Sequence, residues 1–259
     1  TGDSRELPPE SSGPEPVAAG SDRKQKERPA TPTEIASQEE RPTAPFDVEQ
    51  YLKDRSPPVD NAAPLYLIAL KRIRGIPTVG KLADIAKLAS GGTSPALVEQ
   101  ALAAAGPALK QIDKAQLKPE CVFVTELTFD ALLPHVQDAR QVASASLLEV
   151  FLAGAKQDSA MSELAIKRTL RLSRDLQPRG FLISQLVSIT MDRIILDGVL
   201  KFTLTDRNLT VEQCDRLLAL LVEHQEASLN RYEEAMHVEY IVTRQTVEDV
   251  GSGRLTAKN

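Results

Sequence analysis

Residues 130–176 read DALLPHVQDARQVASASLLEVFLAGAKQDSAMSELAIKRTLRLSRDL, and this stretch decides the fold class. In its first half, apolar side chains recur every three or four residues, which is the period of one helix face. This row consists of Leu132, Leu133, Val136, Ala139, Ala143, Leu147, Val150 and Phe151. Residues 154–158 interrupt the period, and a second helical segment follows at 159–176. Two such helices joined by a short turn pack as an antiparallel αα-hairpin.

The second segment of the hairpin separates apolar from basic side chains. At helical spacing, one face carries Met161, Leu164, Ala165 and Leu172. The opposite face carries Lys167, Arg168, Arg171 and Arg174, and Arg179 continues this basic strip. We expect the apolar face to point inward and the basic strip to be solvated. A contact with an acidic partner or with lipid head groups is the alternative.

Further segments with a helical period flank the hairpin, at 62–74, 79–89, 95–117, 181–204 and 210–250. Thr210 and Gln213 have the spacing of a capping box. The run of strand-forming residues at 121–125 has no second run to pair with. The sequence therefore predicts an all-α protein, an irregular helical bundle of about six to seven helices. A stacked αα-hairpin superhelix is the second choice, since the 34-residue period of a helical array is not repeated.

Composition agrees with this fold class and excludes one class of partner. The chain has 259 residues, of which 42% are hydrophobic and 4% aromatic, with no Trp. Few aromatic residues and many Leu and Ala favour packed helices over sheets. The net charge is -5 and the pI is near 5.4, so the chain lacks the basic field that nucleic-acid binding requires. We expect no nucleic-acid partner.

The N-terminal part differs in composition from the rest. Residues 1–58 contain ten of the seventeen prolines and almost no large apolar side chains. Such a segment cannot bury enough surface to offset its ordering entropy, so we predict a disordered Pro-rich linker at 1–58, a helical domain at 59–250 and a flexible tail at 251–259. As an alternative for the end of the linker, one amphipathic turn with Phe46, Val48, Tyr51 and Leu52 packs on the domain.

The most apolar segment, 181–204, is long enough to span a bilayer, but Asp192, Arg193 and Asp197 interrupt it. Each charge costs about 2.5 to 3.5 kcal/mol at a membrane centre, so we interpret the segment as a core helix. Charges in an apolar helix must be paired or face water. They predict either an ion-pair network that fixes helix register or a polar pocket formed by Asp192, Arg193 and Glu126.

The segment 210–250 is predicted to be one long helix that is anchored by its first half. Its expected inward row is Cys214, Leu217, Leu218, Leu221, Leu229, Tyr232 and Met236. Leucines are concentrated in the first half, whereas acidic and basic residues outnumber large apolar ones in the second. We therefore expect the second half to pack more loosely.

The sequence holds one weak candidate for a metal site and no cofactor motif. Glu234 and His237 have the Glu-x-x-His spacing of ferritin-like di-iron helices. A di-iron site needs this motif twice, but Leu132 and Leu221 occupy the matching positions before His135 and His224. A solvated helix face is the simpler reading, and we expect no metal and no cofactor. Two cysteines, Cys121 and Cys214, are interpreted as buried thiols without a neighbouring base.

Three stretches resemble an uncharacterised family of helical proteins common in planctomycete bacteria. They are DNAAPLYL at 60–67, LRLSRDL at 170–176 and GFLISQLV at 180–187. The resemblance extends over roughly residues 58–250, and it implies no catalytic residues. Members often carry a signal or membrane segment ahead of the helices. By that resemblance the linker would be a tether, the membrane would be reached only through an N-terminal anchor, and the location would be the cell envelope or periplasm. A cytoplasmic location is the alternative.

Together these features predict a helical interaction or scaffold module rather than an enzyme. The prediction rests on the helix content, the tether-like linker and the lack of a catalytic constellation. It implies a protein partner. The rival hypothesis is an enzyme or ligand-binding domain with a polar site between helices, around Asp192, Arg193 and Glu126.

Overall fold

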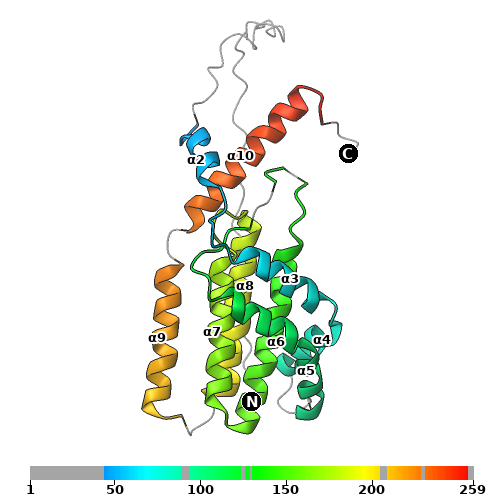
Figure 1. Ribbon diagram of the computed structural model, residues 1–259, viewed down its shortest axis with the longest axis vertical. Coiled ribbons are helices and arrows are strands. Elements are labelled where there is room, and N and C mark those ends of the chain that lie inside the picture. Colours follow the sequence, from blue (N-terminus) through cyan, green and yellow to red (C-terminus); the bar gives the residue numbers. More distant parts are fainter. Residues whose placement is uncertain are drawn as a thin grey trace, which may run out of the picture. The chain divides into compact units, whose positions relative to one another are not determined.

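The structure is a computed structural model, and it describes residues 44–88, 94–123, 126–128, 130–204, 209–228 and 231–255. Contacts divide the chain into two units, 1–45 and 46–259. Only the second unit is described below. Across the described residues every regular element is a helix, which confirms the all-α prediction (Figure 1). The strand-like run near residue 121 contributes only an isolated bridge between Asn61 and Glu120.

The helices follow the sequence signals closely at their amino ends. They are α2 (Val48–Asp54), α3 (Ala63–Arg74), α4 (Pro77–Leu88), α5 (Pro95–Ala115), α6 (Pro134–Lys156), α7 (Ser159–Asp175), α8 (Leu182–Gly198), the π-helical turn η1 (Val199–Thr203), α9 (Val211–Ala227) and α10 (Arg231–Gly251). Pro95 and Pro134 stand at the first turns of α5 and α6, where the missing N–H costs nothing. Gly75 ends α3, and Pro77 begins α4 two residues before the segment predicted at 79–89.

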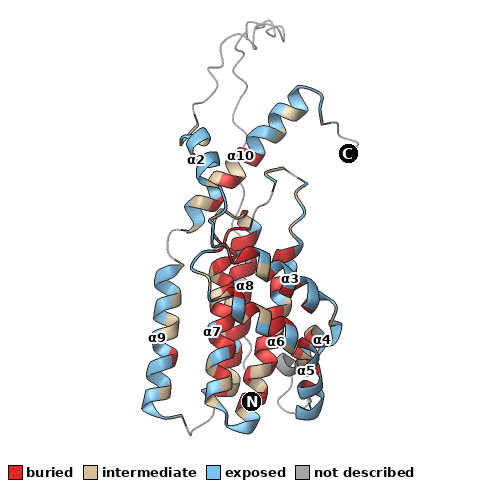
Figure 2. Ribbon diagram, in the orientation of Figure 1, coloured by how far each residue is buried: buried red, intermediate tan, exposed pale blue. Residues whose placement is uncertain are grey.

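The hairpin of α6 and α7 forms the centre of an irregular helical bundle. Gln157 adopts a left-handed conformation after α6, and the Asp158 side chain caps α7 by accepting a bond from the Met161 N–H at 3.0 Å. α6 contacts α3, α4, α5, α7, α8 and η1. Figure 2 shows buried residues concentrated along α6, α7 and α8, whereas α9 is mostly exposed. The core is therefore built around the predicted hairpin.

Two orientations predicted for α7 are wrong. Leu164, expected inside, is 50% exposed, and Arg168, expected in the solvated basic strip, is 3% exposed. The Arg168 guanidinium donates to Asp113 of α5 at 2.7 Å and also bonds to Glu149 of α6. Its backbone carbonyl accepts from Gln116 at 2.8 Å. Arg168 is buried because two carboxylates from neighbouring helices pair with it.

The predicted long C-terminal helix is two helices. α9 ends at Ala227 with Ser228 as its cap, and α10 begins at Arg231. The capping box of Thr210 and Gln213 at the start of α9 is confirmed. α9 packs mainly on α7, and α10 packs on α8.

The predicted inward row is consequently wrong for most of its members. Only Leu217 is buried; Leu221 is half-buried, Cys214, Leu218, Tyr232 and Met236 are exposed, and Leu229 lies outside the described residues. α10 buries Ala235, Val238, Ile241 and Val242. The second half of this region is thus the better anchored one, because the break lets α10 turn a different face inward.

The predicted linker overlaps the helical unit. Residues 46–58, which we placed in the linker, belong to the second unit and include α2. The Phe46 ring stacks on His237 with ring centroids 3.9 Å apart, and the Tyr51 hydroxyl donates to the carbonyl of Glu234 at 3.2 Å. Tyr51 also packs beside Phe181 and Val238. The alternative of an amphipathic turn that packs on the domain is the one observed, while residues 1–43 lie outside the described part.

Candidate functional site

The inner face of α8 fixes this helix firmly against the bundle. The Ser188 hydroxyl donates to the Ser173 carbonyl at 2.9 Å, and the Ser173 hydroxyl donates back to the Ser188 carbonyl at 3.2 Å. A Cβ on Gly198 would lie 2.5 Å from a methyl carbon of Leu147, so α8 and α6 approach closely there. These reciprocal hydrogen bonds and this close packing fix which face of α8 points into the bundle. The opposite face therefore points outward.

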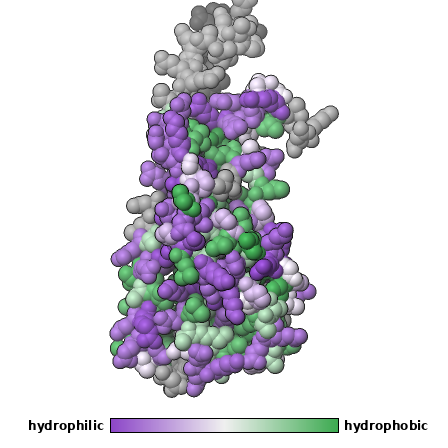
Figure 3. Space-filling view, in the orientation of Figure 1, coloured by the Kyte–Doolittle hydropathy of each residue, from purple (hydrophilic) through white to green (hydrophobic). Residues whose placement is uncertain are grey.

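The outer face of α8 carries apolar side chains that stay about half exposed in the part of the chain that the structure describes. We define it by Ile183, Leu186, Ile189, Arg193, Asp197, Leu200 and Leu204, the last two on and just after η1. The exposed fraction of its apolar members runs from 42% at Ile183 to 61% at Leu200. Elsewhere, on the face seen in Figure 3, apolar and polar side chains are interspersed. A row of half-exposed aliphatic side chains on the most apolar helix is the unusual feature of this surface.

Charges in the middle of the outer face pair with each other. Arg193 Nε lies 3.9 Å from Asp197 Oδ2, one helical turn away, and both side chains are more than half exposed. These two charges therefore avoid the cost of burial by facing water. We predicted an ion-pair network that fixes the register between helices. Arg193 and Asp197 instead pair with each other within α8, at the surface.

Asp192 points to a different neighbour. Its Oδ2 lies 3.0 Å from Nε2 of His224, and this contact joins α8 to α9. Asp192 Oδ1 and His224 Nδ1 are buried and have no partner among the described residues. Glu126 is exposed, outside any helix. Arg193 faces solvent beside Asp197 rather than joining Asp192, so the pocket formed by Asp192, Arg193 and Glu126 stays a prediction.

Glu234 and His237, the weak metal candidates, are both partly buried on α10. The His237 ring stacks on Phe46 and makes an edge contact with Tyr51. Oε2 of Glu234 lies 3.7 Å from Nη1 of Arg231. Among the described residues there is no group of three or more His, Cys, Asp or Glu side chains that could hold a metal ion.

A second polar region lies beside the ends of α7 and α10. A pocket of about 310 Å³ is lined by Arg171, Arg174, Arg179 and Arg231 together with Glu120, Cys121, Asp175 and Glu234. Arg171 donates to Asp175 at 3.1 Å, and Arg174 donates to Glu223 at 3.0 Å. Three members of the predicted basic strip, Arg171, Arg174 and Arg179, thus line a pocket, whereas Arg168 is buried in the core.

The two cysteines have different surroundings. Cys121 is buried, and burial, with a further contribution from the charge of Asp175, raises the pKa of its thiol. Such a thiol is a poor nucleophile because little thiolate forms. Cys214 is exposed on α9, so the prediction that it is buried is wrong.

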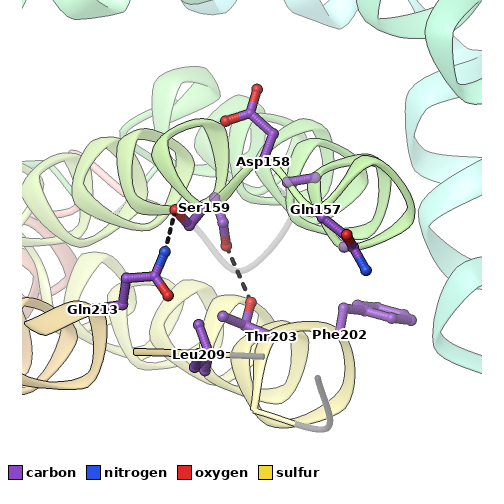
Figure 4. A pocket seen from close by; sticks show the side chains of 10 residues that line it. Gln157, Asp158, Ser159, Phe202, Thr203, Leu209 and Gln213 are labelled. Atoms are coloured by element: carbon purple, nitrogen blue, oxygen red, sulfur yellow. Dashed lines mark hydrogen bonds between the residues drawn. The ribbon is translucent and has the colours of Figure 1, made fainter. Parts of the chain in front are cut away.

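One more pocket, between the α6–α7 turn and η1, is small, and polar side chains in its wall bond to one another. Its volume is about 70 Å³. Gln213 donates to the Ser159 hydroxyl at 2.7 Å (Figure 4), and the Ser162 and Thr203 hydroxyls lie 3.1 Å apart. Since its polar groups pair with one another, it offers little to a ligand.

Comparison with known proteins gives no relative. No protein-family model, no curated protein and no solved structure matches this chain. Within the part of the chain that the structure describes, no helix is both long and apolar enough to cross a membrane. The family resemblance and the envelope location stay predictions from the sequence.

Proposed function

We propose that this chain is a helical interaction module, and that its contact surface is the outer face of α8, which binds the same face of a second copy of the chain. The exposed row of aliphatic side chains on this face is the observation that carries the proposal. Burying a Leu or Ile side chain fully is worth about 1.5 to 3 kcal/mol, so each half-exposed member would contribute about 1 kcal/mol on association.

The spacing of the outer face matches a helix-pairing seam. The steps along this face from Ile183 to Leu204 are three, three, four, four, three and four residues, the spacing at which side chains share one side of a helix and can pack against a second helix. Along a straight helix the row spans roughly 30 Å at 1.5 Å per residue. A second helix of similar length therefore fits along it.

The charge pattern favours a second copy in antiparallel orientation. Two pairs of positions on this face are centred on Ile195: Arg193 with Asp197, and Leu186 with Leu204. If two copies meet with a two-fold axis level with Ile195, Arg193 of each copy faces Asp197 of the other. A two-fold interface is self-complementary in this way, and charges within a seam select its register.

The expected affinity is low, since one helix face buries less than the roughly 800 Å² per partner of a standard interface. We expect a dissociation constant on the order of 10 µM. Sedimentation equilibrium from about 2 to 200 µM measures it. Arg193→Asp and Asp197→Arg should each be monomeric over this range, because like charges then meet across the axis.

Mixing these two variants gives the decisive result. Arg193→Asp presents two carboxylates and Asp197→Arg presents two guanidinium groups, so an equimolar mixture should form a heterodimer although each variant alone does not. The matched control is Arg244→Asp on α10, which breaks a similar exposed pair with Glu248 and should leave dimerisation unchanged. A wild-type chain that stays monomeric at 200 µM, or variants that dimerise like the wild type, would contradict the proposal.

A further inference from the structure

Three arginines, Arg55, Arg179 and Arg231, lie near the single carboxylate of Glu234 where α2, the α7–α8 turn and α10 meet. Arg231 is the group that pairs with Glu234, at 3.7 Å. Arg55 donates to the Arg179 carbonyl at 3.0 Å, and Arg179 donates to the Ser56 carbonyl at 2.8 Å. Within the described residues neither Arg55 nor Arg179 has a carboxylate within ion-pair distance. This corner of the molecule therefore holds an excess of positive charge.

Burial makes that excess unfavourable. Arg55 Nη1 is buried and has no hydrogen-bond partner among the described residues. Burial lowers the pKa of Arg55, and the nearby charge of Arg179 lowers it further, whereas Tyr51 and Glu234 act in the opposite direction. A buried N–H donor without an acceptor has lost its hydrogen bonds to water and gained none in the protein, which destabilises the folded state. An anion bound beside Arg179 would offset the excess positive charge.

The backbone at Arg179 is also held in an unfavourable conformation. Its φ of 55° lies in the left-handed region, which is unfavourable for a residue other than glycine. Strain of this kind persists when surrounding contacts determine it, and it is concentrated at binding sites. Here it accompanies an arginine whose guanidinium lies beside Arg55 and lines the pocket.

The adjoining pocket provides space for a ligand. Its volume of about 310 Å³ lies at the lower end of the range for small-molecule sites. Arg171 and Arg174 on its wall already pair with Asp175 and Glu223, and the Glu120 side chain is exposed at the wall. The excess positive charge in the pocket wall therefore comes from Arg179 and Arg231.

We propose that Arg179 and Arg231 bind a small anion bearing a phosphate or carboxylate group in this pocket, with the charge of Arg55 behind Arg179 adding to the attraction. Guanidinium groups match both chemistries because their planar N–H donors engage two oxygens at once. The site is separate from the outer face of α8. Because Arg179 also donates to the Ser56 carbonyl just after α2, an anion bound by Arg179 would help to hold residues 46–58 on the bundle.

Thermal unfolding and titration calorimetry test the site with two probes, inorganic phosphate and citrate, against sodium chloride of equal ionic strength. Phosphate represents a phosphoryl ligand and citrate a carboxylate ligand. At least one probe should raise the Tm by several degrees at an excess of about 100-fold over its Kd, whereas chloride should not. The stronger probe identifies the ligand class.

Variants locate the site. Arg179→Gln and Arg231→Gln should each weaken binding of the stronger probe by at least tenfold. Without anion, Arg179→Gln should have a Tm equal to or above that of the wild type, because one of the repelling charges is gone. Arg244→Gln, an exposed arginine of α10, is the control and should bind like the wild type. Equal shifts with chloride and with both probes, or unchanged affinity in Arg179→Gln, would overturn the proposal.

Discussion

The hydroxyl of Tyr66 donates a hydrogen bond of 2.6 Å to Oδ2 of Asp175, and this contact joins α3 to the end of α7 in the core. Arg171 donates to the same oxygen at 3.1 Å. Burial raises the pKa of the Asp175 carboxyl, and the bonds from Tyr66 and Arg171 oppose that shift. The carboxylate is therefore stable in the interior only while both donors are present.

Tyr66→Phe removes one of these donors and leaves the ring in place. We expect the free energy of unfolding at neutral pH to fall by about 1 to 3 kcal/mol, the cost of an unsatisfied buried acceptor. Denaturant unfolding measures it. Tyr232→Phe, at an exposed position of α10, is the control and should change stability by less than about 0.5 kcal/mol. Equal effects of the two substitutions would show that the bond to Asp175 contributes nothing.

Arg168 gives a second prediction, since it is the buried partner of Asp113 and Glu149. Arg168→Ala leaves the Glu149 carboxylate without its cation, and we expect a loss of about 3 to 5 kcal/mol at neutral pH. Arg216→Ala removes an exposed pair with Glu163 and should cost at most about 1 kcal/mol.

The pH dependence of the Arg168→Ala variant checks the cause. Burial already raises the pKa of Glu149, and the charge and hydrogen bond of Arg168 lower it again. Without Arg168 the pKa of Glu149 in the folded state rises further above its value in the unfolded state. As the pH falls, Glu149 is therefore protonated in the folded state at a higher pH than in the unfolded state. The deficit of the variant relative to wild type should therefore shrink on acidification. A deficit that is independent of pH would point to lost packing instead.

Local signals in the sequence were sufficient for much of the fold. The turn around Gln157, the proline-initiated helices and the capping box at Thr210 all follow from neighbouring residues. The break after Ser228 could not be predicted, because Leu229 and Asn230 carry no strong helix-breaking signal. Tertiary packing of α10 on α8 determines the new helix direction.

Burial of Arg168 was beyond sequence reasoning for a different reason. Its partners Asp113 and Glu149 come from two other helices, and no local spacing brings them together. The outer face of α8, by contrast, had a usable signal. The three- and four-residue steps that contain Arg193 and Asp197 also contain Leu186 and Leu200, so the charges mark the outward side of an otherwise apolar helix.

His135 predicts a specific loss of stability in acid. Its ring stacks on Phe123 with centroids 4.5 Å apart, and burial lowers its pKa to about 4, with the charge of Asp138 acting in the opposite direction. The unfolded chain binds the proton near pH 6.5 and the folded chain only near pH 4. The stability contributed by neutral His135 is thus present above pH 6.5 and is lost as the pH falls toward 4, by on the order of 3 kcal/mol.

His135→Phe keeps a ring against Phe123 and cannot be protonated. Chemical denaturation at a series of pH values from 4 to 7 should show the wild type losing stability relative to this variant as the pH falls. A difference between the two proteins that stays constant over this range would mean that His135 titrates alike in both states.

The N-terminal boundary of the helical unit can be tested by two truncations. A chain beginning at residue 44 keeps Phe46 and Tyr51, whereas a chain beginning at residue 59 loses both. The Phe46 ring stacks on His237, and Tyr51 bonds to the Glu234 carbonyl and packs beside Phe181. We expect the shorter chain to be less stable than the longer one by about 2 kcal/mol or more, the value of two partly buried aromatic side chains. For a domain of this size that corresponds to a difference in Tm of several degrees.

Phe46→Ala with Tyr51→Ala in the longer chain should reproduce most of the difference, since it removes the same contacts without shortening the chain. If both truncations melt at the same temperature, α2 adds nothing to the folded unit, and the boundary at residue 58 suggested by composition would be the correct one.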